Sequence, residues 1–146
     1  MTQVVFNSYN FQIEDTLQGR FIFDIIRKKK VLLTPEEWVR QHILHYLVFE
    51  KNYSKNLIAI ERAIEVNGLT KRFDILVFDR VGKPYLMVEC KAQHIELNEQ
   101  TLNQILVYNQ ALSVPYLWIS NGKQNFCYQA TGNLKLLNEI PEKPPA

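Results

Sequence analysis

The sequence RFDILVFDRVGKPYLMVECK (residues 72–91) contains two apolar runs that are rich in β-branched and aromatic residues. A turn with glycine and proline separates the runs, and this pattern predicts a β-hairpin. Because strand side chains alternate between faces, Glu89 and Lys91 project to one side and Cys90 to the other. If Asp74 lies near Glu89 across the hairpin, two carboxylates and an ammonium group meet at one edge of a sheet.

Bulk composition indicates one soluble globular domain. The chain has 146 residues, of which 47% are hydrophobic and 22% are charged. Its net charge of +2 is too small to indicate a nucleic-acid-binding protein by itself. No apolar run is long enough to span a membrane, and no signal peptide is evident. The two cysteines lack metal-ligand spacing, so we expect free thiols, a cytoplasmic location and no membrane contact.

The ends of the chain are less regular than its centre. We expect a single domain over residues 1–146, with a poorly defined segment at 1–18 and a flexible, proline-rich tail at 138–146. A strand is predicted at 20–26. The four consecutive cations at 27–30 are typical of a solvated turn, and a phosphate contact is the alternative.

A helix is predicted to begin after Thr34, which is a suitable N-cap, and to run to about residue 51. Proline at the first helical position and Glu37 in a capping box support this start. On a helical wheel Glu36 stands at the head of the apolar, core-facing side, whereas Glu37 and Arg40 lie away from it. The helix dipole could account for an acid on that side in the first turn.

The later elements alternate between strands and helices. A helix between two strands permits a parallel crossover. We therefore predict an α/β fold, a mixed β-sheet flanked by helices with the core order αβββαβ. The expected elements are a strand at 57–66 ended by a turn at Asn67 and Gly68, the hairpin at 72–91, a helix at 98–112 capped by Asn98, a strand at 115–120, a two-residue turn at Asn121 and Gly122, and a strand at 124–129.

The charged end of the hairpin has the groups that metal-dependent phosphodiester hydrolysis requires. Hard oxygen ligands select Mg²⁺ or Mn²⁺, which lowers the pKa of its bound water and binds phosphate oxygens. Asp74 and Glu89 are candidate ligands, and Glu36 and the main-chain carbonyl of Cys90 are further candidate oxygens. Lys91 could orient the water or neutralise the phosphate. The alternative is an ion pair in which Lys91 only neutralises the neighbouring acids.

These residues resemble a known nuclease superfamily. Asp74 followed by Glu89-Cys90-Lys91 is similar to the D…E-x-K signature of the PD-(D/E)xK nucleases. Gln104 and Tyr108 lie four residues apart on the second predicted helix and therefore share a face of it. Their spacing resembles the Q-x-x-x-Y motif of the RecB-like branch of that superfamily.

A more specific resemblance starts at the first predicted helix. Its sequence TPEEWVRQ (residues 34–41) resembles the N-terminal nuclease domain of type I restriction enzyme R (HsdR) subunits. In that family an E-x-x-x-R helix precedes the catalytic hairpin, which favours Glu36 over Glu37 as the site acid. The resemblance spans roughly residues 20–128. The chain has no G-x-x-x-x-G-K-[ST] phosphate loop, so what resembles the nuclease is a domain without the fused motor.

The resemblance implies a restriction-endonuclease-like fold and hydrolysis of DNA phosphodiester bonds with Mg²⁺, for which Mn²⁺ can substitute. It implies that Asp74 and Glu89 hold the metal ion, with Glu36 as an auxiliary ligand. Lys91 then positions the nucleophilic water or offsets phosphate charge. The residues expected to support the site or bind DNA are Gln104, Tyr108, Lys71 and Arg72, the last two because they precede Asp74 as cations.

Several partners and two other functions remain open at this stage. The expected partners are DNA, a separate motor or specificity protein, and a second copy of the chain in a homodimer. A non-catalytic DNA-binding or assembly module that kept the nuclease fold is the first alternative. A repair or mobile-element nuclease with its own partner is the second.

Overall fold

The protein is built around a six-stranded sheet with the strand order β4-β5-β6-β7-β8-β9. The computed structural model describes residues 1–66, 68–109 and 114–145, without the side chains of Val66, Leu69 and Tyr108. Strands β6 and β7 are parallel, and the other neighbouring strands are antiparallel. The strands are β4 (Ile58–Val66), β5 (Leu69–Phe78), β6 (Pro84–Cys90), β7 (Tyr116–Ser120), β8 (Asn125–Gln129) and β9 (Lys135–Leu136).

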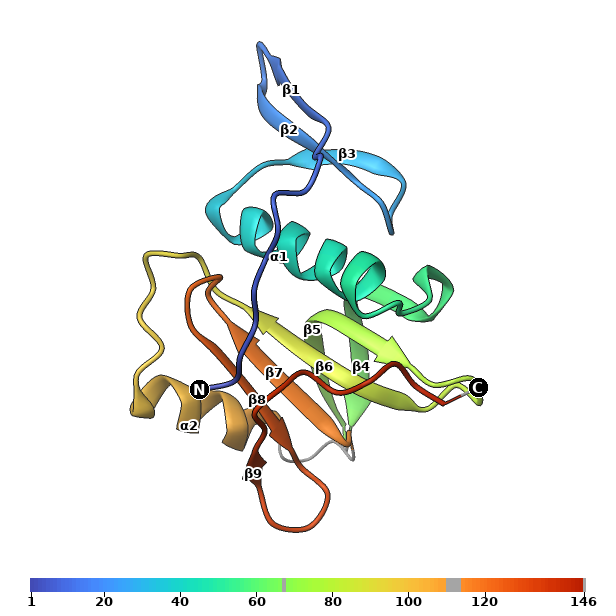
Figure 1. The fold of residues 1–146 in the computed structure, drawn as a ribbon, viewed down its shortest axis with the longest axis vertical. Coiled ribbons are helices and arrows are strands. Elements are labelled where there is room, and N and C mark those ends of the chain that lie inside the picture. Colours follow the sequence, from blue (N-terminus) through green and yellow to red (C-terminus); the bar gives the residue numbers. More distant parts are fainter. Residues whose placement is uncertain (67, 110–113, 146) are drawn as a thin grey trace.

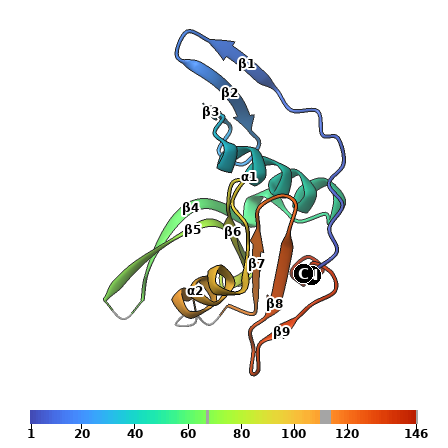
Figure 2. The ribbon, with the colours of Figure 1, turned by 90° about the vertical axis from the view of Figure 1, so that its left-hand side faces the viewer.

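Two helices cover opposite faces of this sheet. Helix α1 (Pro35–His45) packs on one face and α2 (Glu99–Asn109) on the other (Figures 1 and 2). Side chains of β6 alternate between the two cores: Leu86 and Val88 pack with α1 residues, and Met87 packs with α2 residues. The predicted α/β class, the mixed sheet and the αβββαβ core order are confirmed.

A separate three-stranded sheet lies beyond α1 (Figure 2). It consists of β1 (Ile13–Thr16), β2 (Gly19–Asp24) and β3 (Lys29–Leu32), and β2 matches the strand predicted at 20–26. The segment expected to be poorly defined thus contains β1. Its start is tied to the C-terminal half of the chain, because the N–H of Thr2 donates to the carbonyl of Asn125 at 2.9 Å.

The basic turn between β2 and β3 differs from the solvated turn that the sequence predicts. Arg27 forms ion pairs with Asp24 at 2.9 Å and with Glu37 at 2.8 Å, and its side chain is only 20% exposed. Lys29 and Lys30 belong to β3. The prediction was therefore wrong for Arg27, because two acids from neighbouring elements replace its water.

Helix α1 begins as predicted, because the Thr34 hydroxyl accepts the N–H of Glu37 at 3.0 Å. A π-helical turn at Tyr46–Glu50 continues it almost to the expected end. The side assigned to solvent was wrong: Glu37 and Arg40 are buried, whereas the side chain of Glu36 is 47% exposed. The turn between β2 and β3 reaches this side of α1, where Arg27 pairs with Glu37, so more than one side of the helix is buried.

The loop between β7 and β8 is longer than predicted. Ser120 pairs with Asn125, so four residues connect the strands instead of a two-residue turn at Asn121 and Gly122. The Asn121 side chain stabilises the longer loop by accepting the N–H of Gln124 at 2.6 Å. Local turn propensity did not reveal this side-chain contact.

Helix α2 begins at the predicted cap, where the Asn98 side chain accepts the N–H of Thr101 at 2.9 Å. The predicted end of this helix at Leu112 and the turn residue Asn67 lie outside the described residues. No helix in the described parts of the chain is long and apolar enough to cross a membrane.

Residues 138–142, expected as part of a flexible tail, lie against the large sheet. Ile140 is buried in the α1-side core. The Tyr53 hydroxyl donates to the carbonyl of Pro141 at 2.7 Å, and the Tyr85 hydroxyl donates to the carbonyl of Glu142 at 2.6 Å. Two side-chain hydroxyls and one apolar anchor therefore hold this segment.

We predict that Tyr53→Phe lowers the free energy of unfolding by about 1–2 kcal/mol, because it leaves the Pro141 carbonyl without its buried donor. Urea unfolding of the two proteins measures this difference. The control is Tyr128→Phe, since Tyr128 is partly buried and its hydroxyl has no hydrogen bond among the described residues. Equal losses in both variants would contradict the assigned role of Tyr53.

Candidate active site

The hairpin places Asp74 beside Glu89, as the sequence predicts. Ile75 pairs with Val88, so the residues just beyond them, Asp74 on β5 and Glu89 on β6, face each other. The carboxylate of Asp74 accepts the main-chain N–H of Cys90 at 2.6 Å. The charge of Asp74 acts on Glu89, as expected of two neighbouring carboxyl groups. The strand pairing and the bond to the backbone thus fix the pair at the end of β6.

The strand opposite Asp74 has an unusual backbone conformation. Strands β4 and β5 keep one register along their length, but the pairing is interrupted where Glu61 stands opposite Asp74. Glu61 has φ 52°, in the left-handed region that few residues other than glycine adopt. This pair of acids is therefore the irregular point of the β4–β5 hairpin.

The side chains of both strands exchange faces at this point. Ile60 and Ile75 pack in the α1-side core, whereas Ile64 and Phe73 pack in the α2-side core. In a regular strand, residues two or four positions apart stay on one face. The irregularity at Asp74 accordingly lets the hairpin bury its apolar residues first against one helix and then against the other.

The partly buried carboxyl pair retains a proton near neutral pH. Burial raises the pKa of Glu89 to about 7, and the negative charge of Asp74 adds to this increase, while Lys91 opposes it. Burial also raises the pKa of Asp74, although the Cys90 N–H and Arg40 stabilise its ionised form. Because Asp74 has these stabilising partners, it ionises first and Glu89 keeps the shared proton.

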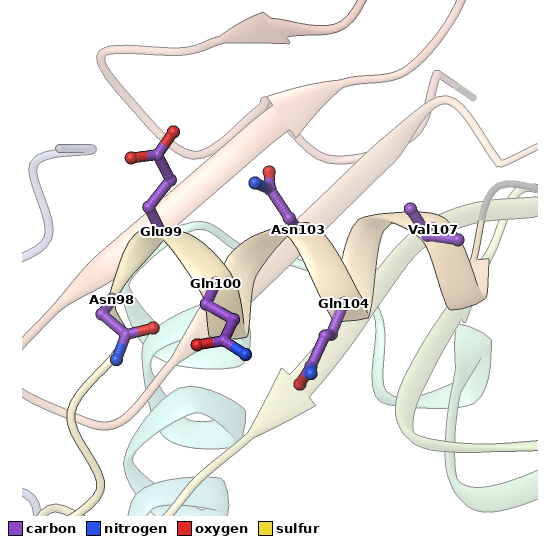
Figure 3. Close-up of a pocket in the computed structure, with 6 residues that line it drawn as sticks. All are labelled: Asn98, Glu99, Gln100, Asn103, Gln104 and Val107. Atoms are coloured by element: carbon purple, nitrogen blue, oxygen red, sulfur yellow. The ribbon is translucent and has the colours of Figure 1, made fainter.

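A pocket of about 370 Å³ opens beside this pair. A larger hollow of about 870 Å³ lies on α2, but its lining comes from residues 98–107 alone and includes neither member of the carboxyl pair. Gln104 lines both hollows, and its side chain points to the side of α2 on which β6 ends (Figure 3). The smaller pocket is the candidate active site, and its lining residues are Arg72, Glu89, Lys91, Gln104, Ile105 and Asn109.

Other predicted site residues lie near the pocket or outside it. Glu36 does not line the pocket, but partial burial and the charge of Asp74 raise its pKa. The Cys90 thiol is buried on the opposite face, and only the backbone of this residue reaches Asp74. Lys71 is only 6% exposed, so of the two cations ahead of Asp74 only Arg72 is well exposed. The side chain of Tyr108 lies outside the described residues.

Two residues of the site were missed by sequence reasoning. Arg40 pairs with Glu37 and with Glu61, each at 3.2 Å, and its guanidinium reaches the main-chain carbonyl of Asp74 at 3.4 Å. The E-x-x-x-R spacing pointed to Arg40, but the helical wheel placed it in solvent. Nothing in the sequence around Glu61 indicates its conformation or its contacts.

The carboxyl pair fits a magnesium ion with few protein ligands. No group of three His, Cys, Asp or Glu side chains in the described ranges is placed to hold a metal ion. The charges of Asp74 and Lys91 act on Glu36, and its role as an auxiliary ligand stays a prediction. Magnesium commonly binds one or two carboxylates and keeps several waters. Two adjacent, partly buried carboxyls repel each other and are stabilised by a proton or a cation, so this donor set suits such an ion.

We predict that the metal-free protein loses stability as the pH rises from about 4.5 to about 7. The folded state holds a proton on Glu89 that the unfolded chain releases near its ordinary pKa of 4.5. In Glu89→Gln this loss of stability disappears. Above pH 7 the free energy of unfolding of the variant is higher than that of the wild type by on the order of 2 kcal/mol.

Urea unfolding in a chelator between pH 4.5 and 8 measures this effect. Glu65→Gln is the control, because Glu65 is an exposed glutamate of β4. If Glu89→Gln and the wild type lose stability in parallel, the protonated pair is refuted.

Comparisons with known proteins agree with this fold. Residues 35–142 match the family described as "Type I restriction enzyme R protein N terminus (HSDR_N)". The match begins at α1 and excludes the three-stranded sheet. Among curated proteins, the comparison gave no match.

A solved structure is also similar, with a TM-score of 0.54 and 22% sequence identity. It is described as a fragment of an HsdR subunit of a type I restriction enzyme from Vibrio vulnificus YJ016. The match covers 75% of this chain but only 24% of that one, and at this identity it supports the fold alone. The family match extends over well more than half of the sequence, and the chain therefore belongs to the family of type I restriction enzyme R protein N termini.

Proposed function

We propose that the protein is a metal-dependent DNA endonuclease that hydrolyses phosphodiester bonds at the Asp74–Glu89 pair. The observation that carries the proposal is the partly buried carboxyl pair at the end of β6, with the ammonium of Lys91 in the same pocket as Glu89. Membership of a restriction-enzyme family supports a nuclease function and makes DNA the substrate to test first. A surface ion pair would not need two adjacent carboxyl groups that are both partly withdrawn from water.

In this proposal Asp74 and Glu89 hold Mg²⁺, and Mn²⁺ can take its place. The bound ion supplies a hydroxide near neutral pH and offsets negative charge on the phosphate. Asp74 presents an oxygen that the Cys90 N–H has already oriented. Glu89 releases its proton when the ion binds, so metal affinity increases with pH up to about 7.

The residues around the pocket have separate roles in binding DNA. The ammonium of Lys91 orients the attacking water or stabilises charge on the phosphate. Arg72 is exposed at the pocket and binds the DNA backbone, and Gln104 contacts the same strand from α2. Glu36, whose side chain is half exposed, acts as an auxiliary ligand directly or through water.

The proposed partners follow from the family. We propose that the protein acts with a separate motor or specificity protein that brings it to DNA, and that two copies pair to cut both strands. The solved relative supports only the shared fold, since this chain spans about a quarter of its length. Sedimentation and co-purification would test both partners.

We predict that Asp74→Asn, Glu89→Gln and Lys91→Ala each lower DNA cleavage by roughly 100-fold or more, because each removes a metal ligand or the group that acts on the water. The assay uses plasmid and single-stranded DNA with Mg²⁺ or Mn²⁺. Glu99→Gln is the control, because Glu99 extends from α2 on the side opposite to Gln104 (Figure 3). Cleavage that survives a combined Asp74→Ala and Lys91→Ala substitution would exclude this site.

A non-catalytic DNA-binding or assembly module is the second candidate function. It is favoured by the lack of three clustered metal-ligating side chains among the described residues. Calorimetric titration with Mn²⁺ at pH 8 separates the two candidates. The nuclease predicts one site that is lost in Asp74→Asn, and at pH 6 its affinity is weaker because protons compete for Glu89. No binding at millimolar Mn²⁺ would favour the non-catalytic module.

A further inference from the structure

Three arginines from different elements converge on the carboxylate of Glu61. Arg72 of β5 donates to it at 3.0 Å, and Arg40 of α1 lies at 3.2 Å. Arg27, from the turn between β2 and β3, lies at 4.0 Å. Glu61 thus contacts three arginines beside the candidate active site.

The backbone of Glu61 adopts an energetically unfavourable conformation. The left-handed conformation is unfavourable by about 1–2 kcal/mol for a residue with a Cβ atom, and glycine, asparagine or aspartate adopts it more readily. Such outliers persist where the surroundings determine them, and they cluster at functional sites. Glycine or asparagine would fit this backbone conformation better. The presence of a glutamate here therefore indicates that its side chain has a role of its own.

The contact between Glu61 and Arg72 indicates what this role is. Its side chain is 69% exposed, so without a partner its guanidinium would sample many rotamers. Ordering an arginine side chain costs up to about 2 kcal/mol, and a pre-ordered arginine avoids this cost when it binds a ligand. The Glu61 contact holds Arg72 in a pocket that it lines together with Glu89 and Lys91.

Arg40 connects the same acid to the other side of the site. Glu37 and Glu61 hold its guanidinium between them, and it reaches the main-chain carbonyl of Asp74. One carboxylate therefore contacts both the arginine at the backbone of Asp74 and the arginine at the pocket.

We propose that Glu61 is a positioning residue, which holds the guanidinium of Arg72 where it binds a phosphate of the DNA backbone next to the Asp74–Glu89 pair. This inference rests on the proposed nuclease function, because it assumes that DNA occupies the pocket. The competing explanation is an ion pair that stabilises the β4–β5 hairpin and does not act on DNA.

The two explanations predict different changes in DNA affinity when the charge of Glu61 is removed. An acid close to DNA repels the phosphates, so removing its charge should tighten binding if Glu61 acts only through its field. If Glu61 positions Arg72, removing the carboxylate releases the arginine and weakens binding. Asparagine suits the test, because it tolerates the left-handed backbone and lacks both the charge and the reach of glutamate.

The experiment is a double-substitution cycle on the full chain with a fluorescent DNA duplex of about 20 base pairs, in calcium to occupy the oxygen site. Arg72→Ala should weaken binding by about tenfold and lower the salt-dependence slope by about 1. Glu61→Asn should weaken binding several-fold, and it should cause no further weakening when Arg72→Ala is already present. Glu61→Asp, which keeps the charge, should restore part of the affinity.

Controls and contrary outcomes separate this inference from the proposed function. Glu65→Asn, at an exposed glutamate of the same strand, should bind DNA as the wild type does or more tightly. Urea unfolding checks that Glu61→Asn is folded, and Glu61→Gly replaces it if it is not. Binding by Glu61→Asn that equals or exceeds the wild type, or an additive cycle, overturns the positioning role alone. A wild-type chain that binds no DNA overturns both proposals.

Discussion

The hydrogen bond from the Cys90 N–H to the Asp74 carboxylate is the interaction on which the site depends. It joins β5 to β6 where β6 ends, and it stabilises the ionised form of the partly buried Asp74. Glu89, which faces Asp74, then retains the proton and has its pKa raised to about 7. Burial and one main-chain donor thus make two similar carboxyl groups different, and this difference suits them to exchange a proton for a metal ion.

A chain of buried charges connects the site to the N-terminal part of the protein. Asp24 pairs with Arg27, Arg27 with Glu37, and Glu37 with Arg40, which also contacts Glu61. Removing one member of such a chain leaves an unpaired buried charge, which is strongly destabilising. The three-stranded sheet lies outside the family match, yet its turn contributes to the same charge network as α1 and β4. This part of the protein therefore supports the surroundings of the site.

Sequence reasoning succeeded where the signal was local. The hairpin, the Thr34 and Asn98 caps and the approach of Asp74 to Glu89 follow from the period-two pattern and from side-chain capping. It failed for Arg40, because a helical wheel assumes one buried side, and here a second layer packs on α1. The auxiliary role of Glu36 stays a prediction, since its side chain is half exposed although the charge of Asp74 acts on it.

The amino-acid sequence alone specifies the α/β order, the hairpin with its acids and lysine, and the family resemblance, because all of these depend on neighbours in the chain. The tertiary structure decides which charges are buried, which carboxyl group keeps the proton, and which acid orders the arginines. These properties come from desolvation and from contacts between residues far apart in the sequence, such as Arg40 with Asp74. The left-handed Glu61 is the clearest case, since it lies where the pairing of β4 with β5 is interrupted opposite Asp74, and no local sequence signal marks this point.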